Sequence, residues 1–173
     1  MRRLVFILLC GLIVVPAALA SSRAAGDGVL ELKAVYGYVQ IGTVAQPAKG
    51  ALWGQMDHGV LKVVDPVAGD GQIYVSGWEN KTVKDDDPKT TVYSGHDLHF
   101  RVTGGKYKLV FIGSGIDLTA VGTGVAQLDG DASALDAGSY AVDSGKWKPV
   151  PVLLVAKQTW SVPFGDQSAP SSP

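Results

Sequence analysis

The chain has 173 residues, of which 15 are Lys or Arg and 16 are Asp or Glu, so its formal net charge is −1. A near-neutral chain with scattered lysines lacks the basic patch of a nucleic-acid-binding protein and the basic helix of a membrane-surface protein. We therefore expect no nucleic acid among its partners. Without the segment 1–20, the chain has the length of one ordinary domain.

Residues 1–20 have the pattern of an export signal. Arg2 and Arg3 form a charged start, residues 4–15 are almost wholly apolar, and residues 18–20 form a small-x-small cleavage site. We predict cleavage after Ala20 and a secreted or cell-envelope protein without a stable membrane span. An uncleaved anchor is the alternative, although a span needs about 20 apolar residues. Loss of the two arginines leaves 13 cationic and 16 acidic residues, a net charge of −3.

The only cysteine, Cys10, lies inside the predicted signal. The predicted mature chain therefore has no disulfide, no thiolate metal site and no cysteine nucleophile. Its stability has to come from its core, which a domain of about 150 residues can supply.

Short runs of alternating or apolar residues, separated by turn residues, follow one another after the signal. A period of two indicates half-buried strands, and no stretch repeats apolar residues at helical spacing over three turns. The predicted strands, in chain order, are 29–41, 51–53, 60–64, 73–78, 99–103, 107–112, 116–118, 140–142, 152–157 and 159–162.

The middle of the chain, residues 90–131, contains the clearest strand pattern. Phe100 and Val102 share one face of the strand 99–103. Gly104-Gly105 follows, and two glycines that adopt positive φ favour a tight two-residue turn. The sequence therefore predicts a hairpin with the return strand that begins near Tyr107.

Two Gly-x-Gly segments, 113–115 and 122–124, interrupt the strand pattern. Glycine inside a strand marks a bulge, a bend or a close backbone approach, and small closed barrels need such bends at their corners. A phosphate-binding loop would need a helix directly after the glycines, and residues 116–118 alternate like a strand instead.

These features predict an all-β fold, a single antiparallel β-barrel of about eight to ten short strands. A β-sandwich is the alternative, and closure of a barrel would remove exposed sheet edges. The predicted organisation is a signal peptide at 1–20, a flexible segment at 21–27, the β-domain at 28–165 and a disordered Ser/Pro-rich tail at 166–173.

Three histidines are candidate metal ligands. His58, His96 and His99 could form a site together with a nearby Asp, because imidazole is the commonest metal ligand. The alternative is that they are exposed strand and turn residues. The acidic loops near residues 65–70 and 85–87 lack the ligand spacing of an EF-hand.

Trp147 is the candidate ligand-binding residue. It lies between two lysines and a proline, and exposed aromatic residues often anchor ligands. The alternative is a ring that covers one end of the barrel. We expect Trp53, Trp78 and Trp160 to lie in the core.

No catalytic motif stands in a fitting context. The chain has neither a Gly-x-Ser-x-Gly elbow nor a Ser-x-x-Lys motif in such a context, and sequence alone cannot place two carboxylates at the separation a glycosidase needs. We predict no catalytic residue and no cofactor.

The runs TVYSGHDLHFRV and TGGKYKLVFIGSGIDLTAVGTGVAQLDG, followed by SYAVDSGKW, resemble small exported β-rich proteins of actinobacteria. The resemblance covers about residues 90–147, a third of the chain. It consists mainly of glycines at bends and alternating apolar residues, so it implies a shared fold and no particular function or site.

The sequence thus predicts an exported, non-catalytic β-domain that binds an envelope glycan, a small ligand or another protein. A metal-binding exported protein that uses the histidines and an aspartate is one alternative. An enzyme with an unrecognised site is the other, since a fold hosts many functions.

Overall fold

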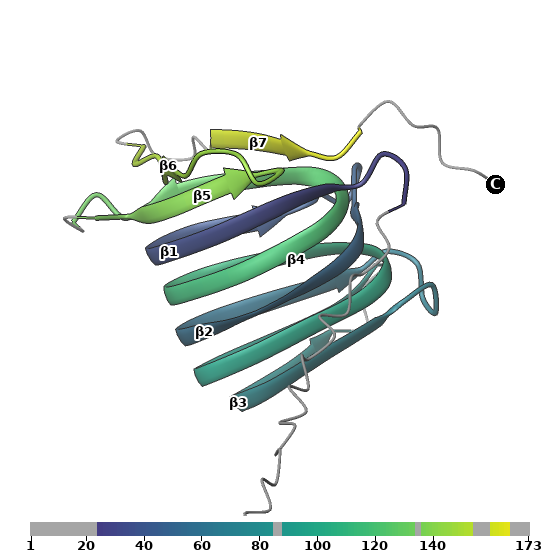
Figure 1. Ribbon diagram of the computed structural model, residues 1–173. Helices are drawn as coiled ribbons and strands as arrows, with labels where there is room; N and C mark the ends of the chain where they lie inside the picture. The colour runs from purple at the N-terminus through teal and green to yellow at the C-terminus, as the bar shows by residue number, and fades with distance from the viewer. Residues whose placement is uncertain (1–23, 85–87, 134–135, 154–159, 167–173) are drawn as a thin grey trace, which may run out of the picture.

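The computed structural model describes residues 24–84, 88–133, 136–153 and 160–166. The predicted signal peptide, most of the predicted strand 152–157 and all of the predicted tail except Asp166 lie outside the described residues. Every regular element that the structure describes is a β-strand, so the all-β prediction is confirmed (Figure 1). The strands are β1 (Gly28–Ile41), β2 (Ala48–Asp65), β3 (Gln72–Lys84), β4 (Lys89–Gly130), β5 (Gly138–Val142), β6 (Lys148–Pro149) and β7 (Trp160–Phe164).

The first three strands and β4 form one long two-stranded ribbon. Residues 37–84 form one side of the ribbon and residues 90–130 form the other. Along the first side the residue numbers rise while the numbers of their partners in β4 fall, so the two sides run antiparallel. The pairs that mark this register are Gln72 with Thr103, Lys84 with Thr90, Val64 with Lys108, Lys49 with Thr123, Ile41 with Ala126, and Gly37 with Gly130.

This ribbon is coiled on itself. Val64 pairs with Lys108 on one side and with Thr90, much earlier in the same strand, on the other. Ile41 likewise pairs with both Leu109 and Ala126. One turn of the coil therefore extends along β4 from Thr90 to Lys108, or from Leu109 to Ala126, and β1 and β2 lie between successive turns (Figure 1).

The result is one sheet with the strand order β2-β4-β1-β5-β6, in which β3 and β7 also pair with β4. It does not close into a barrel, so the barrel prediction is wrong. The physical reason is the offset between the turns, because each turn pairs with the next one along the coil instead of returning to its own start. Among the described residues β3 pairs only with β4, which leaves its other edge at one end of the coil.

Rows of glycines mark the corners of the coil. In one row Gly37 pairs with Gly113 and Gly130, and Gly59 pairs with Gly95 and Gly113. A Cβ atom on Gly113 would lie 2.1 Å from the carbonyl oxygen of His58, and one on Gly59 would lie 2.2 Å from that of Ile112. Only glycine allows the backbones to approach this closely, so these residues fix where the sheet bends.

A second glycine row forms the opposite corner. There Gly122 pairs with both Gly28 and Gly50, and a Cβ atom on Gly122 would lie 1.9 Å from the carbonyl oxygen of Lys49. The predicted bends at 113–115 and 122–124 are therefore confirmed, because Gly113 belongs to the first row and Gly122 to the second.

The two rows divide the coil into two layers. The first layer contains residues 29–36, 51–58, 72–76, 96–103 and 114–121. The second layer contains residues 38–41, 60–65, 78–84, 89–94, 106–112 and 123–129. The layers pack face to face, since the rings of Phe100 in the first layer and Phe111 in the second lie 4.7 Å apart between centroids.

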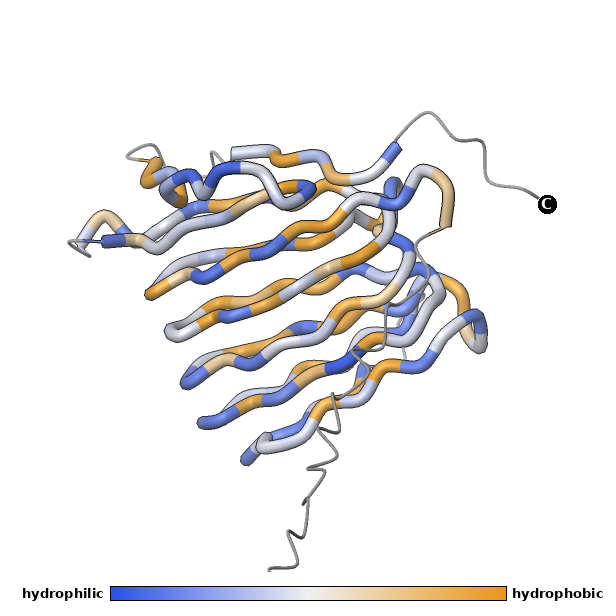
Figure 2. Tube along the Cα trace, viewed as in Figure 1, coloured by the Kyte–Doolittle hydropathy of each residue, from blue (hydrophilic) through white to orange (hydrophobic). Residues whose placement is uncertain are grey.

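Hydrophobic and hydrophilic residues alternate along much of the coil (Figure 2). In β1, β2 and β4 this alternation buries one face of the strand in the shared core. At the first glycine row the alternation shifts by one position, and the same shift recurs in the passes of β1 and β2 and in two passes of β4. The buried pairs on either side of the corner are Ala34 and Val39, Met56 and Leu61, Tyr93 and Leu98, and Phe111 and Ile116. Each such shift corresponds to one extra residue at the corner. This residue lets the chain turn while the apolar side chains of both layers still face the core.

The predicted hairpin at Gly104-Gly105 is wrong. Both glycines adopt a φ of 79°, as a tight turn would need. However, Thr103 pairs with Ala51 and Lys106 pairs with Lys49, so the two glycines form a bulge at the second corner. The chain continues into the next turn of the coil, with β2 between the two passes.

Candidate functional site

A shallow groove of about 650 Å³ lies on the outer face of the first layer. Two neighbouring rows of outward side chains, each crossing β3, β4, β2 and β4 again, supply its floor. The first row is Tyr74, Arg101, Trp53 and Thr119, and the second row is Ser76, His99, Gln55 and Asp117.

Strand alternation places these side chains outward. Val75, Phe100 and Leu118 point into the core between them, and this burial fixes the orientation of the intervening residues. The groove residues therefore stand on a rigid sheet and need no loop to position them.

The aromatic rings of the groove are open to solvent. Trp53 is 43% exposed and Tyr74 is 56% exposed. The prediction that Trp53, Trp78 and Trp160 lie in the core is wrong, because each is at least 43% exposed. For Trp53 the reason is its register: its neighbour Leu52 takes the buried position, so the indole faces outward.

The charges of the groove are unevenly paired. Asp117 forms an ion pair with Lys33 at 3.3 Å. Arg101 is exposed, and no carboxylate among the described residues lies within ion-pair distance of it. Tyr74 donates a hydrogen bond from its hydroxyl to Gln72 Oε1. Among the described residues, the guanidinium of Arg101 thus has no charged partner, and it lies between two exposed aromatic residues.

A second hollow of about 520 Å³ adjoins the groove, and Gln55 and Asp117 line both. Lys33 lines the second hollow beside Asp117, and Asp57 lines it beside Gly115. Together the two hollows extend along the outer face of the first layer towards the first glycine row.

The three candidate metal ligands do not come together. His58 and His96 face each other across β2 and β4, and their rings stack at 4.3 Å. His96 Nδ1 also lies 2.8 Å from Glu79 Oε1. His99 instead lines the groove beside Gln55. Within the part of the chain that the structure describes, no group of three His, Cys, Asp or Glu residues could hold a metal ion.

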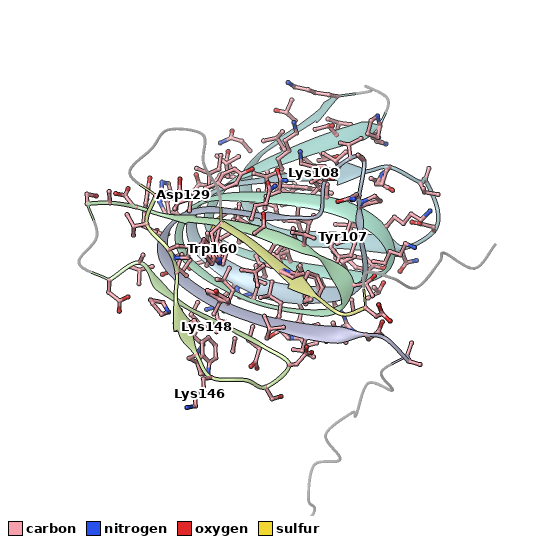
Figure 3. All side chains as sticks on the ribbon, turned by 90° about the horizontal axis from the view of Figure 1, so that it is seen from above. Tyr107, Lys108, Asp129, Lys146, Lys148 and Trp160 are labelled. Atoms are coloured by element: carbon pink, nitrogen blue, oxygen red, sulfur yellow. The ribbon has the colours of Figure 1, made fainter. Side chains whose placement is uncertain are left out.

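Trp147 lies in the segment between β5 and β6 and is 48% exposed. The flanking Lys146 and Lys148 are exposed, and Lys146 lies at the edge of the molecule (Figure 3). Trp147 lines neither hollow, so its role in ligand binding stays a prediction that the groove does not support.

The chain matches no family model, and it matches neither a curated protein nor a solved structure. Among the described residues there is no helix that could cross a membrane.

Sequence reasoning missed Trp53, Tyr74 and Arg101 as a group. The alternation in 99–103 already placed Arg101 and His99 on the polar face. The neighbours of these residues across the sheet follow from the coil register, and no local pattern reveals that Tyr74 and Trp53 lie on either side of Arg101.

Proposed function

We propose that this chain is an exported, non-catalytic binding module of the cell envelope or extracellular space, and that the groove of the first layer is its binding surface. One observation carries the proposal: Trp53 and Tyr74 stand exposed on either side of Arg101 in one row of a rigid sheet.

Exposed aromatic rings on a flat sheet favour a ligand that is itself flat and partly apolar. Ligand sites are typically apolar surfaces with a few placed polar groups. Here the rings supply the apolar surface, while Gln55, His99 and Arg101 supply hydrogen-bonding groups around them. A saccharide ring has a matching structure, with an apolar C–H face and a polar hydroxyl rim.

The row Ser76, His99, Gln55 and Asp117 contains the residue types of a catalytic triad, but its spacing argues against one. Gln55 stands between His99 and Asp117, so the two lie two strand spacings apart, roughly 10 Å. A carboxylate has to contact the imidazole in order to orient it. We therefore favour binding over catalysis.

Titration of the mature chain with soluble glycans, followed by tryptophan fluorescence, tests the proposed surface. We expect saturable quenching that Trp53→Ala and Tyr74→Ala abolish. Trp147→Ala is the matched control, because Trp147 is similarly exposed but lies outside the groove. Saturable binding that is lost in Trp147→Ala and kept in Trp53→Ala would contradict the proposal.

Export is tested separately. Expression of the full chain in a secreting bacterial host should give a mature protein in the envelope or medium whose first residue is Ser21, as intact mass and N-terminal sequencing would show. Retention of residues 1–20 would instead support the uncleaved anchor.

A further inference from the structure

We infer that the groove binds an acidic saccharide, a sugar chain that carries carboxylates, with Arg101 pairing with a carboxylate and with Trp53 and Tyr74 stacking against sugar rings on either side. This inference rests on the proposed function and specifies its ligand class.

The first step of the argument is the position of Arg101. It pairs across the sheet with Tyr74 of β3 on one side and with Trp53 of β2 on the other. The two aromatic residues therefore lie two strand spacings apart, roughly 10 Å, with the guanidinium between them. This order of ring, cation and ring suits an extended chain in which an acidic unit lies between stacked units.

The second step is the charge of the groove. Asp117 is the acidic residue among those that line it, and Lys33 already neutralises this carboxylate. Glu31 lies beyond Thr119, at the far end of the same row. Arg101 is thus a cation without a charged partner among the described residues, in a chain that carries more acidic than basic residues. A groove of this kind attracts an anion locally.

The third step is the shape of the anion. A guanidinium presents a planar fork of N–H donors that matches a carboxylate in bidentate fashion. A neutral sugar chain would cover Arg101 without pairing its charge, which is unfavourable. A nucleic acid carries a phosphate at every unit and needs several cations, whereas this groove offers one arginine.

The test compares a carboxylated polymer with its neutral ester. Polygalacturonate, alginate and hyaluronate are titrated into the mature chain by calorimetry, together with fully methyl-esterified polygalacturonate. The ester keeps the sugar rings and removes the charge. We expect at least one acidic polymer to bind, and the ester of a bound polygalacturonate to bind at least tenfold more weakly.

Variants assign the effect to the groove. Arg101→Gln should weaken binding of the acidic polymer about tenfold or more and should leave any residual binding of the ester unchanged. Lys62→Gln is the matched control, because Lys62 is exposed on the outer face of the second layer. It should bind like the wild type. Thermal unfolding of each variant verifies that it is folded.

The outcomes separate this inference from the proposed function. One outcome is that the acidic polymer and its ester bind equally well, that Trp53→Ala abolishes this binding and that Arg101→Gln leaves it unchanged. This outcome would overturn the inference of an acidic ligand but would support the groove as the binding surface. Loss of binding in Trp147→Ala alone overturns both. Binding of none of the three acidic polymers, or tighter binding of single-stranded DNA than of any of them, overturns the acidic saccharide.

Discussion

The outer faces of the first and second layers differ in how their polar side chains are satisfied. On the second layer Tyr38 donates a hydrogen bond to Gln40 Oε1 at 2.8 Å, and Gln40 Nε2 donates to Gln127 Oε1 at 2.8 Å. On the first layer Arg101, His99 and Gln55 have no such partners among the described residues. One outer face of the scaffold thus carries a bonded row of polar side chains, and the other carries three groove side chains without side-chain partners among the described residues.

Burial follows the same difference. Gln40 is only 7% exposed, whereas Trp53 is 43% exposed. Around Gln40 the outer face of the second layer therefore contributes to stability, whereas Trp53 and its exposed neighbours in the groove contribute little. Changes on the two outer faces should consequently separate stability from binding.

The largest expected effect comes from breaking the corner that both layers share. Gly113→Ala would place a methyl group 2.1 Å from a backbone oxygen of β2, and backbone atoms cannot move aside without opening the ladder. We expect a loss of about 3 kcal/mol or more in the free energy of unfolding, measured by urea denaturation.

Gly69→Ala is the control for that change. Gly69 also has a positive φ, 85°, but no atom lies within 4 Å of the added methyl group. It should cost about 1 kcal/mol through backbone strain alone. If both substitutions cost the same, the glycine row does not define the corner.

The next effect distinguishes the two outer faces. Gln40→Ala removes a buried amide and leaves Gln127 and Tyr38 without their partner, so it should cost about 1–3 kcal/mol. Gln55→Ala removes the same group from the first layer, where it has no partner among the described residues, and should change stability by less than about 0.5 kcal/mol. Chemical denaturation of both variants measures the difference, and equal losses would remove the contrast between the layers.

Two tyrosines of the second layer give a smaller effect. Tyr107 is buried in the core, and its hydroxyl has no hydrogen-bond partner among the described residues. The hydroxyl of Tyr38, by contrast, donates a hydrogen bond to Gln40. Tyr107→Phe should therefore stabilise the fold by about 1 kcal/mol, since it removes an unsatisfied buried group. A destabilised variant would mean that the hydroxyl has a partner.

The same residue predicts a dependence on pH. Burial disfavours the phenolate and raises the pKa of Tyr107 well above its ordinary value of 10.0. A group whose pKa is raised on folding contributes stability that is complete below the pKa of the unfolded chain and is lost as the pH rises above it. Unfolding should therefore begin as the pH passes about 10, and Tyr107→Phe should move the alkaline midpoint upward.

The smallest expected effect lies in the groove. Trp53→Ala and Arg101→Gln alter exposed side chains of the first layer, so each should change the free energy of unfolding by less than about 0.5 kcal/mol. Thermal denaturation checks this. A large loss in either variant would mean that the groove residues serve the fold.

Much of the fold was predictable, because it follows from local patterns. Alternation placed the strands 29–41 and 99–103, the buried face of the second and that of the first up to Ala34, and glycines 113 and 122 marked bends. Around Gly37 the buried face shifts by one position, so Tyr36 is exposed and Val39 is buried. The coil was predictable in part as well, since Gly95, Gly104, Gly113 and Gly122 stand at equal intervals, each about half of one turn.

The rest depends on register. Alternation fixes which face of a strand is buried, but it does not fix which strand lies beside it. The sequence therefore could not distinguish a hairpin at Gly104-Gly105 from a continuing coil. The groove depends on the same information. Tyr74, Trp53 and Arg101 come from three separate strands, and only the offset between turns makes them neighbours.

The most direct test of the account is an NMR titration of the indole N–H signals of the four tryptophans. All four are at least 43% exposed, and each lies in a different part of the chain. The account predicts that addition of the acidic saccharide that binds shifts the Trp53 signal and leaves those of Trp78, Trp147 and Trp160 in place. A shift at Trp147 with Trp53 unchanged would contradict it.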